Sequence, residues 1–477
     1  MSMRRPPAAY GMMAAALLLA GCAGAPVYEK PAIDLPAMWQ SSTPFRAGAP
    51  DDAGLKGNWW EVFGDAQLNQ LAQQTLTHNQ SLAGAAARLE QARSQVTVSS
   101  AGLFPQAGLQ AGAARQKTSA NRPLAAYNST NQSVVQDNYQ LGFAASYEAD
   151  LFGRVRSGVQ SARAAAGQAA ADFENVRLVL CSELAADYFN LRELDAEIDV
   201  LKQGIVLQQK AYDFIEARHE LGAATGLDLA QQQSLLDASK TQLELLLSQR
   251  AQYEHAIATL TGTPAPSFKL PPAVVALTPP SLPVGLPSDV LQRRPDVAAA
   301  ERAVAAANAN IGVARAAWFP SVMLQSSGGW DSSQMSKLLQ APSLVWSLGA
   351  AVTQSLFDAG KSDATVAIAQ AGYTGVVATY RQSVLVAMQE VEDGMSGLAA
   401  LGRAHALSDA SVRSSQRVLE LANDRYAGGV ETYFDVITAQ QTLLANQRLA
   451  VQIRGKQMVG SVYLVKALGG GWKAPPP

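Results

Sequence analysis

The chain has 477 residues, 16% of them charged, and a formal net charge of −2. This near-neutral balance lacks the basic footprint of a nucleic-acid-binding protein, so no nucleic acid partner is expected. The hydrophobic fraction of 48% excludes a disordered chain, and abundant alanine with little charge favours helices that pack closely on several sides.

The N-terminal segment 1–21 has the pattern of a lipoprotein signal peptide. A positively charged start is followed by an apolar stretch over 12–20, which is too short to cross a membrane as a helix. The stretch ends in Leu-Ala-Gly-Cys, the lipobox pattern in which Cys22 becomes the acylated, palmitate-bearing first residue of the mature protein. Ala23 stands where Asp would signal inner-membrane retention, so outer-membrane sorting is expected. The alternative is an ordinary signal peptide in which Cys22 is incidental.

Residues 22–56, rich in proline and small side chains as far as Pro50, predict a lipidated tether. Once Cys22 is lipidated, Cys181 is the one remaining thiol, so no internal disulfide can form. Cys181 lies in an apolar helical run, and we expect it to be a small buried hydrophobic residue rather than a nucleophile.

The rest of the chain reads as a duplication. The copies are 57–263 and 288–471, a Pro-rich linker at 264–287 joins them, and a short tail follows at 472–477. Four landmarks recur in the same order at offsets of about 205 to 215 residues, which indicates duplication of a whole structural unit. They are Phe104-Pro105 with Phe319-Pro320, Leu151-Phe152 with Leu356-Phe357, Arg218 and Asp228 with Arg425 and Asp435, and Leu260-Thr261-Gly262 with Leu468-Gly469-Gly470.

Each copy predicts a helix, a strand pair, a long helix and a further helix. No proline occurs between 123 and 264 or between 342 and 475, and proline-free stretches permit very long helices, such as one over 158–217. The last helices keep a seven-residue apolar repeat, which indicates coiled-coil packing. In the second copy this repeat consists of Ile437, Leu444, Val451, Met458 and Val465.

Short segments of alternating polarity lie between the helices. Their period of two and their length of ~10 residues are typical of membrane-spanning strands. The predicted strands are 109–118 and 138–150 in the first copy, and 321–332 and 343–356 in the second. Four strands cannot close around an aqueous lumen, and open edges in lipid leave backbone groups unpaired. If these strands are inserted in a membrane, the chain must oligomerise.

Three ordered motifs carry a resemblance to a known family. They are Trp59-Trp60 followed by Phe63-Gly64-Asp65, Leu-Gln-Arg-Arg-Pro-Asp-Val at 291–297, and the run at 306–320 that ends in Phe319-Pro320. The chain resembles the TolC-type outer membrane factors, and among them the OprM-like (NodT) efflux lipoproteins, from Cys22 to about Trp472. The resemblance implies a mainly α fold with a membrane β-barrel: a homotrimer that shares a 12-stranded barrel and continues as a long periplasmic α-helical barrel.

The resemblance also implies a function. The protein would be the outer-membrane exit duct of a tripartite RND-type pump, conferring multidrug resistance by passively conducting drugs or other small molecules from an inner-membrane pump and a periplasmic adaptor. It would be lipid-anchored in the outer membrane with a periplasmic extension. Two alternatives stay open: the exit channel of type I-like protein secretion, and a periplasmic coiled-coil scaffold lipoprotein without a pore.

Four residues match the family's periplasmic gate. Tyr426 matches the gate tyrosine, and Asp228 matches its hydrogen-bond partner on the neighbouring helical pair. Phe434 matches the apolar constriction, and Asp435 matches a position that is acidic in some members.

The chain departs from the family pattern at two gate positions. Glu431 stands where some relatives carry a basic residue, and Thr438 where some carry Asp. Ion selectivity therefore does not carry over from the family, and the presence of the gate salt bridge stays open. A simpler interpretation is that Asp228 and Asp435 are helix N-cap carboxylates after tight turns, and the two roles can coexist.

The sequence carries no motif for enzymatic chemistry. It contains no Gly-rich phosphate loop, no HExxH and no cysteine pair, and its four histidines lie far apart. We therefore expect no catalytic residue, no metal site and no cofactor beyond the covalent lipid on Cys22, and we expect that the protein is not an enzyme.

Overall fold

A computed structural model describes residues 26–34, 36, 38–40, 46–47, 57–121, 133–280, 282–284 and 294–470. The lipidation site Cys22, most of the expected tether and the tail at 472–477 lie outside the described residues. The chain divides into two compact units, and each contains segments of both copies. We call them the strand unit (Met1–Pro31, Leu89–Ala169 and Ala300–Tyr380) and the hairpin unit (Ala32–Arg88, Ala170–Ala299 and Arg381–Pro477).

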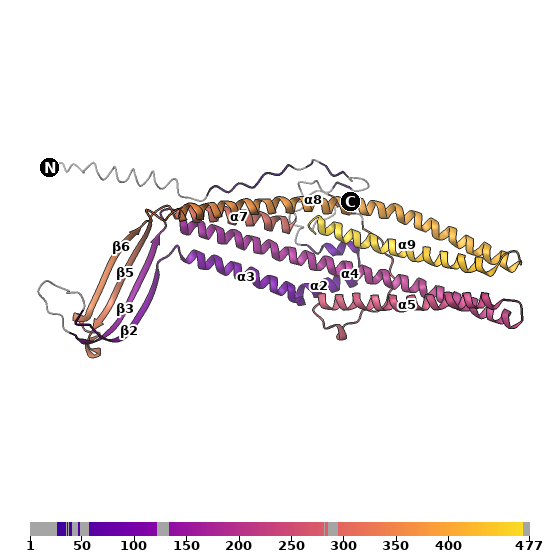
Figure 1. Ribbon diagram of the computed structural model, residues 1–477, viewed down its shortest axis with the longest axis horizontal. Coiled ribbons are helices and arrows are strands. Elements are labelled where there is room, and N and C mark those ends of the chain that lie inside the picture. Colours follow the sequence, from indigo (N-terminus) through magenta and orange to yellow (C-terminus); the bar gives the residue numbers. More distant parts are fainter. Residues whose placement is uncertain are drawn as a thin grey trace. The chain divides into compact units, whose positions relative to one another are not determined.

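The strand unit contains one antiparallel sheet with the strand order β2-β3-β5-β6 (Figure 1). Its strands are β2 (Gln106–Lys117), β3 (Val135–Ala149), β5 (Ser321–Ser332) and β6 (Leu344–Thr353). The β5–β6 connection contains the short 3-10 helices η4 (Met335–Lys337) and η5 (Ala341–Ser343). Because β3 pairs with β5, the strand pairs of the two copies join into a single sheet.

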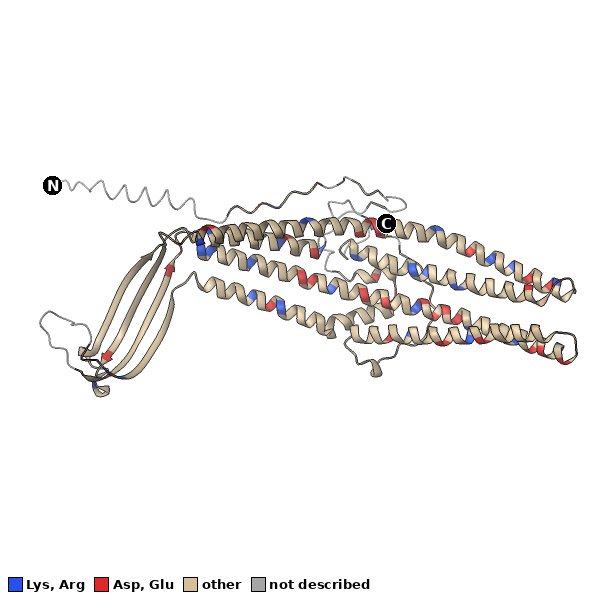
Figure 2. Cartoon of the chain, viewed as in Figure 1, with Lys and Arg blue, Asp and Glu red and all other residues tan. Residues whose placement is uncertain are grey.

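The sheet has one apolar and one polar face. On the apolar face, Leu109 pairs with Phe143, Phe143 with Gly328, and Gly328 with Trp346. On the other face, Gln140 Nε2 donates to Asp331 Oδ2 at 3.3 Å, and the Ser327 and Ser347 hydroxyls lie 2.8 Å apart. Figure 2 shows that charged residues are few along all four strands. Alternate residues point to opposite faces of a sheet, so the period-two pattern produces these two surfaces.

Helices precede and follow each strand pair. α3 (Gln80–Ala101) leads to β2 and α7 (Pro295–Ala316) leads to β5, while α4 (Arg154–Glu220) follows β3 and α8 (Lys361–Ala427) follows β6. α4 and α8 have 67 residues each, and the helices after them, α5 (Gly226–Leu260) and α9 (Tyr433–Ala467), have 35 each. The corresponding helices of the two predicted copies therefore have equal lengths. Within the described residues, no helix combines the length and the apolar character needed to cross a membrane.

In the hairpin unit, α5 runs back along α4, and α9 runs back along α8 (Figure 1). A core at the base of these hairpins contains Trp60 of η2 (Trp59–Phe63), Leu68 of α2 (Ala66–His78) and an apolar stripe of α4. That stripe includes Leu184, Tyr188 and Leu191. Cys181 is 1% exposed in this core, as expected, and burial raises the pKa of its thiol to about 12.

A buried ionic network attaches the linker to this core. Asp195 of α4 accepts from Arg192 Nη1 at 2.7 Å and from Arg250 Nε of α5 at 2.6 Å. The same two arginines donate to the carbonyl oxygens of Pro271 and Leu270, and the Ala273 amide donates to Asp195. The segment 270–273, part of the linker expected at 264–287, is therefore held by charge-assisted hydrogen bonds. Before this segment the linker contains η3 (Ala265–Ser267), and after it β4 (Pro283–Val284), which pairs with β1 (Arg46–Ala47).

Candidate gate at the helix-hairpin turns

The turn between α4 and α5 ends one helix and starts the next with defined caps. Gly222 has a φ of 74°, a left-handed conformation that favours glycine, and the Ala223 amide donates to the Arg218 carbonyl at 2.7 Å. Thr225 then caps α5. Its Oγ1 accepts from the Asp228 amide, while Asp228 Oδ2 accepts from the Thr225 amide at 3.0 Å, which is a capping box.

The turn between α8 and α9 repeats this design. Gly429 has a φ of 72°, and the Val430 amide donates to the Arg425 carbonyl at 3.0 Å. Thr432 is the N-cap of α9, and its Oγ1 donates to Asp435 Oδ2 at 2.8 Å. Asp228 and Asp435 thus stand three residues after the N-cap rather than at it. A carboxylate in the first turn of a helix is stabilised by the helix dipole, so both residues have a local structural role.

The two hairpins of the chain are joined by a residue that the sequence analysis did not single out. Tyr433 of α9 donates from its hydroxyl to Gln232 Oε1 of α5 at 3.0 Å, and Gln232 Nε2 donates to the Gln208 carbonyl of α4 at 2.9 Å. Tyr433 and Gln232 are buried, and burial raises the pKa of Tyr433 to about 12, with smaller contributions from Tyr426 and Asp228. The surrounding apolar cluster includes Ile215, Leu235, Val436 and Ile437.

We call the Tyr433–Gln232–Gln208 contacts between the two hairpins the joint. Tyr426 lies beside it. Its ring centroid is 5.1 Å from that of Tyr433, and the Arg218 guanidinium lies 5.4 Å from the Tyr426 ring centroid. Between the described residues of this one chain, no hydrogen bond joins Tyr426 to Asp228. That pairing therefore stays a prediction for the assembled protein.

Glu431 and Thr438, the two departures from the family pattern, have local partners. Arg425 Nε lies 2.9 Å from Glu431 Oε1 across the turn, and Thr438 Oγ1 donates to the Phe434 carbonyl at 2.9 Å. The acidic Glu431 therefore pairs with a cation of its own hairpin.

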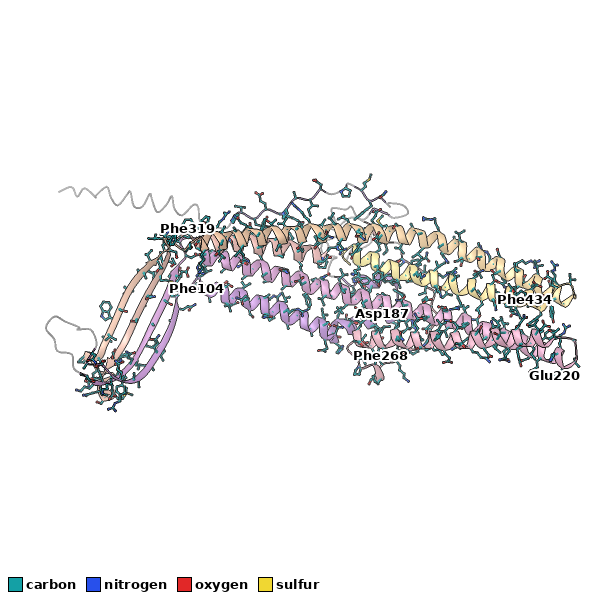
Figure 3. The ribbon with its side chains drawn as sticks, viewed as in Figure 1. Phe104, Asp187, Glu220, Phe268, Phe319 and Phe434 are labelled. Atoms are coloured by element: carbon teal, nitrogen blue, oxygen red, sulfur yellow. The ribbon has the colours of Figure 1, made fainter. Side chains whose placement is uncertain are left out.

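Phe434 and Asp435 point away from the joint. Phe434 is 58% exposed at the turn end of α9 (Figure 3), and Asp435 is exposed beside it. Asp435 also lines a groove of 640 Å³ between α8 and α9. Its other lining residues include Ser411, Val418, Arg425, Thr438 and Asn446. α9 thus packs Tyr433 and Val436 against the α4–α5 hairpin. Phe434 and Asp435 lie on a side of α9 that is exposed in the single chain, which we call the free side of α9.

The model of a known family, described as outer membrane efflux protein, matches residues 71–263 and 286–470. The chain belongs to the outer membrane efflux protein family. The two matched stretches cover most of both copies. The protein is accordingly located in the outer membrane and functions in efflux.

Individual efflux proteins are similar to the chain over almost their full lengths. It is 32% identical to pyoverdine export outer membrane protein OpmQ of Pseudomonas aeruginosa, covering 97% of both chains. It is 32% identical to outer membrane protein OprJ of the same species, covering 98% of this chain and 97% of that one. The solved structure of the outer-membrane channel OprN superimposes with a TM-score of 0.87 at 28% identity, covering 94% of this chain and all of that one.

Tyr433 and Gln232 of this efflux protein are not among the residues predicted from the sequence, although a signal for Tyr433 exists. It precedes Ile437 of the heptad series by four residues and therefore shares its buried face. For Gln232 no comparable signal exists, because its partner lies 201 residues away. Among the described residues no cluster of three or more His, Cys, Asp or Glu side chains could hold a metal ion.

Proposed function

We propose that three copies of this efflux protein assemble into the exit duct of a tripartite RND-type pump. In this assembly the sheets of the three copies form one membrane barrel, and the helices continue as a periplasmic tunnel. The protein conducts substrate passively, and an inner-membrane pump with its periplasmic adaptor supplies the energy. The covalent lipid on Cys22 anchors the N-terminus in the outer membrane.

The observation that carries this proposal is the sheet with one apolar face and two open edges. Within the described residues, β2 and β6 each pair on one side only. Unpaired backbone groups cost several kcal/mol each in hydrocarbon, so a membrane-inserted sheet must pair its edges with other copies. Three sheets of four strands give about 12 strands. A barrel of about 8 strands is still filled by its own side chains, so a barrel of about 12 strands has room for a lumen.

The helix-hairpin turns form the proposed gate. Phe434 and Asp435, on the free side of α9, would line the narrowest part of the closed tunnel, where a ring of aromatic side chains hinders passage of hydrated ions. Tyr426 and Asp228 would hold neighbouring hairpins together in the closed state. Adaptor contacts that favour the open arrangement would then open the gate by shifting the population of the two states.

Small molecules are the proposed substrates. OpmQ is named for pyoverdine export, and a relative that is 31% identical, TtgF of Pseudomonas putida, is named as a toluene efflux pump component. Both names indicate small organic cargo. Protein secretion is the runner-up, and no feature of the described residues favours it.

Two measurements test this function. Purified full-length protein in planar bilayers should conduct weakly when closed, and its conductance should rise when the gate residues are replaced. Deleting the gene should raise susceptibility to small toxic compounds, and the intact gene should restore resistance. Loss of protein secretion with unchanged susceptibility would instead support the secretion channel, and purified protein that neither oligomerises nor conducts would support the scaffold.

A further inference from the structure

The strand unit contains an aromatic contact between the two copies of the duplication. The rings of Phe152 and Phe319 are stacked, with centroids 4.9 Å apart and an interplanar angle of 15°. Phe319 immediately precedes Pro320 and β5, at the junction with α7 (Figure 3), and Phe152 lies between β3 and α4. The stack therefore closes the end of the sheet where β3 and β5 pair.

Each edge of the sheet carries one phenylalanine that corresponds, in the duplication, to one member of this stacked pair. Phe104 precedes Pro105 and β2 as Phe319 precedes Pro320 and β5, and Leu356-Phe357 follows β6 as Leu151-Phe152 follows β3. Phe152 and Phe319 stack on each other, whereas the rings of Phe104 and Phe357 have no aromatic partner among the described residues. Phe357 is 90% exposed and Phe104 is 67% exposed.

We propose that Phe357 of one copy stacks on Phe104 of the next copy, so that each boundary between subunits repeats the internal Phe152–Phe319 contact. This inference rests on the proposed oligomeric duct, and it names the residues that close it. The occupant of each sheet edge is thus a second copy of this chain.

Strand direction supports this arrangement. β2 and β5 run one way and β3 and β6 the other, because every neighbouring pair is antiparallel. When β6 of one copy lies beside β2 of the next, the two strands are antiparallel, as β3 and β5 are. The chain enters β2 from Phe104 and leaves β6 towards Phe357, so both rings lie at the same end of that boundary.

Burial supports it as well. Every residue of β2 and of β6 is exposed in the single chain, whereas β3 and β5, which have neighbours on both sides, are partly covered. Exposed aromatic rings at the end of an open sheet edge gain both area burial and ring–ring contact when a matching edge covers them. The other arrangement, in which both rings lie against lipid at the membrane interface, is an outcome of the test.

Thiol cross-linking tests the contact in the full-length lipoprotein. In a Cys181→Ser background, Phe104→Cys and Phe357→Cys are combined, and purified protein is treated with a short bis-maleimide. We expect covalent species of two and three chains on denaturing gels, and none from either single variant. The control pair Phe152→Cys with Phe319→Cys should cross-link within one chain and leave the mass at one chain.

The outcomes separate the inference from the proposed function. If the protein is a trimer by light scattering and conducts, yet the Phe104–Phe357 pair does not cross-link under conditions that join the internal pair, the stacking is wrong and the duct remains. If the protein is monomeric in detergent, both are wrong.

Alanine variants test the Phe104–Phe357 contact independently of cross-linking. Phe104→Ala and Phe357→Ala should lower the dissociation temperature of the trimer by similar amounts, and the double variant should lower it no further than either single change, because residues in contact are not additive. Additive losses, as expected of two rings that contact lipid separately, would overturn the stacking.

Discussion

Glu193 of α4 occupies the space that a side chain at position 455 of α9 would need. A Cβ atom built on Gly455 would overlap with Cβ and Cγ of Glu193. Glu193 lies beside Glu197, which accepts from Arg448 Nε at 2.8 Å and from Gln452 Nε2 at 3.1 Å. Glu193 Oε1 is buried without a hydrogen-bond partner among the described residues. The two hairpins therefore approach closely around an acidic pair.

This close approach predicts that Gly455→Ala destabilises the hairpin unit. Overpacking of this kind costs about 1–3 kcal/mol, which should appear as a lower temperature of thermal unfolding. The matched control is Gly402→Ala in α8, where an added Cβ meets nothing within 4 Å, and which should be neutral or slightly stabilising. The loss should shrink when Glu193→Ala is combined with Gly455→Ala. Equal losses at positions 455 and 402 would contradict the prediction.

The acidic pair also predicts a pH dependence. Burial, and then the neighbouring Glu197, raise the pKa of Glu193 to about 8, against the opposing effect of Lys456 and Arg448. Glu193, Glu197 and Tyr253 of α5 line one pocket of 380 Å³. The raised pKa favours the protonated form of Glu193 in the folded state, in which its carboxyl can donate to Glu197.

The sign of the effect follows from linkage. A raised folded-state pKa means that the folded state binds more protons than the unfolded state between the ordinary value of 4.5 and about 8. The stabilising contribution of Glu193 to the free energy of unfolding is complete below that pH window and is lost as the pH rises through it. Glu193→Gln should flatten the fall of the unfolding temperature across this window. Asp187, whose pKa burial raises to about 6, contributes in the same direction and should be tested separately with Asp187→Asn.

Local patterns were enough to predict the long helices and the four strands of the sheet, whereas the division of the first helical segment into α2 and α3 and the β1–β4 pair were not predicted. The 67-residue helix α4 contains the whole expected range 158–217, and α4 and α8 are proline-free. β5 has the expected bounds, and β2 begins three residues before its expected start at 109. These features follow from periodicity and from the missing amide of proline, which act over a few residues.

Contacts between distant residues could not be predicted in the same way. Gln232 and Tyr433 have ordinary polar identities, and only the return of α5 and α9 along α4 and α8 brings them together. The pairing of Asp195 with Arg250 is a similar case, across 55 residues. Arg425 and Glu431 are close in sequence, but their ion pair depends on the left-handed turn at Gly429.

The buried network predicts a large effect of Arg250→Ala. This change leaves the Asp195 carboxylate, whose side chain is 1% exposed, with one arginine instead of two, and it frees the Leu270 carbonyl. Removing one partner of a buried ion pair costs about 3–5 kcal/mol. The control is Arg417→Ala, which breaks the exposed pair with Glu420 and should cost at most about 1 kcal/mol. Thermal unfolding of both variants measures the difference, and similar losses would show that the linker is not held by this network.

A test of the gate must distinguish the role of Asp228 between neighbouring hairpins from its role in capping α5. Asp228 accepts from the Thr225 amide, so Asp228→Ala would also weaken the start of α5. Asp228→Asn keeps an acceptor for that amide and removes the charge. Combined with Tyr426→Phe, which removes the hydroxyl expected to pair with Asp228, it should loosen the closed state and raise single-channel conductance in planar bilayers.

Two further variants show which contact holds the gate closed. Thr225→Ala removes the cap but neither gate group, and it should cost about 1 kcal/mol of stability without raising conductance. Tyr433→Phe removes the hydrogen bond to Gln232 inside one chain. If closure depends on contacts between neighbouring copies, Tyr433→Phe should lower the unfolding temperature and leave conductance low. If Tyr433→Phe opens the channel and the Tyr426–Asp228 double variant does not, the joint within each chain is the gate, because only the first change loosens the packing of the two hairpins.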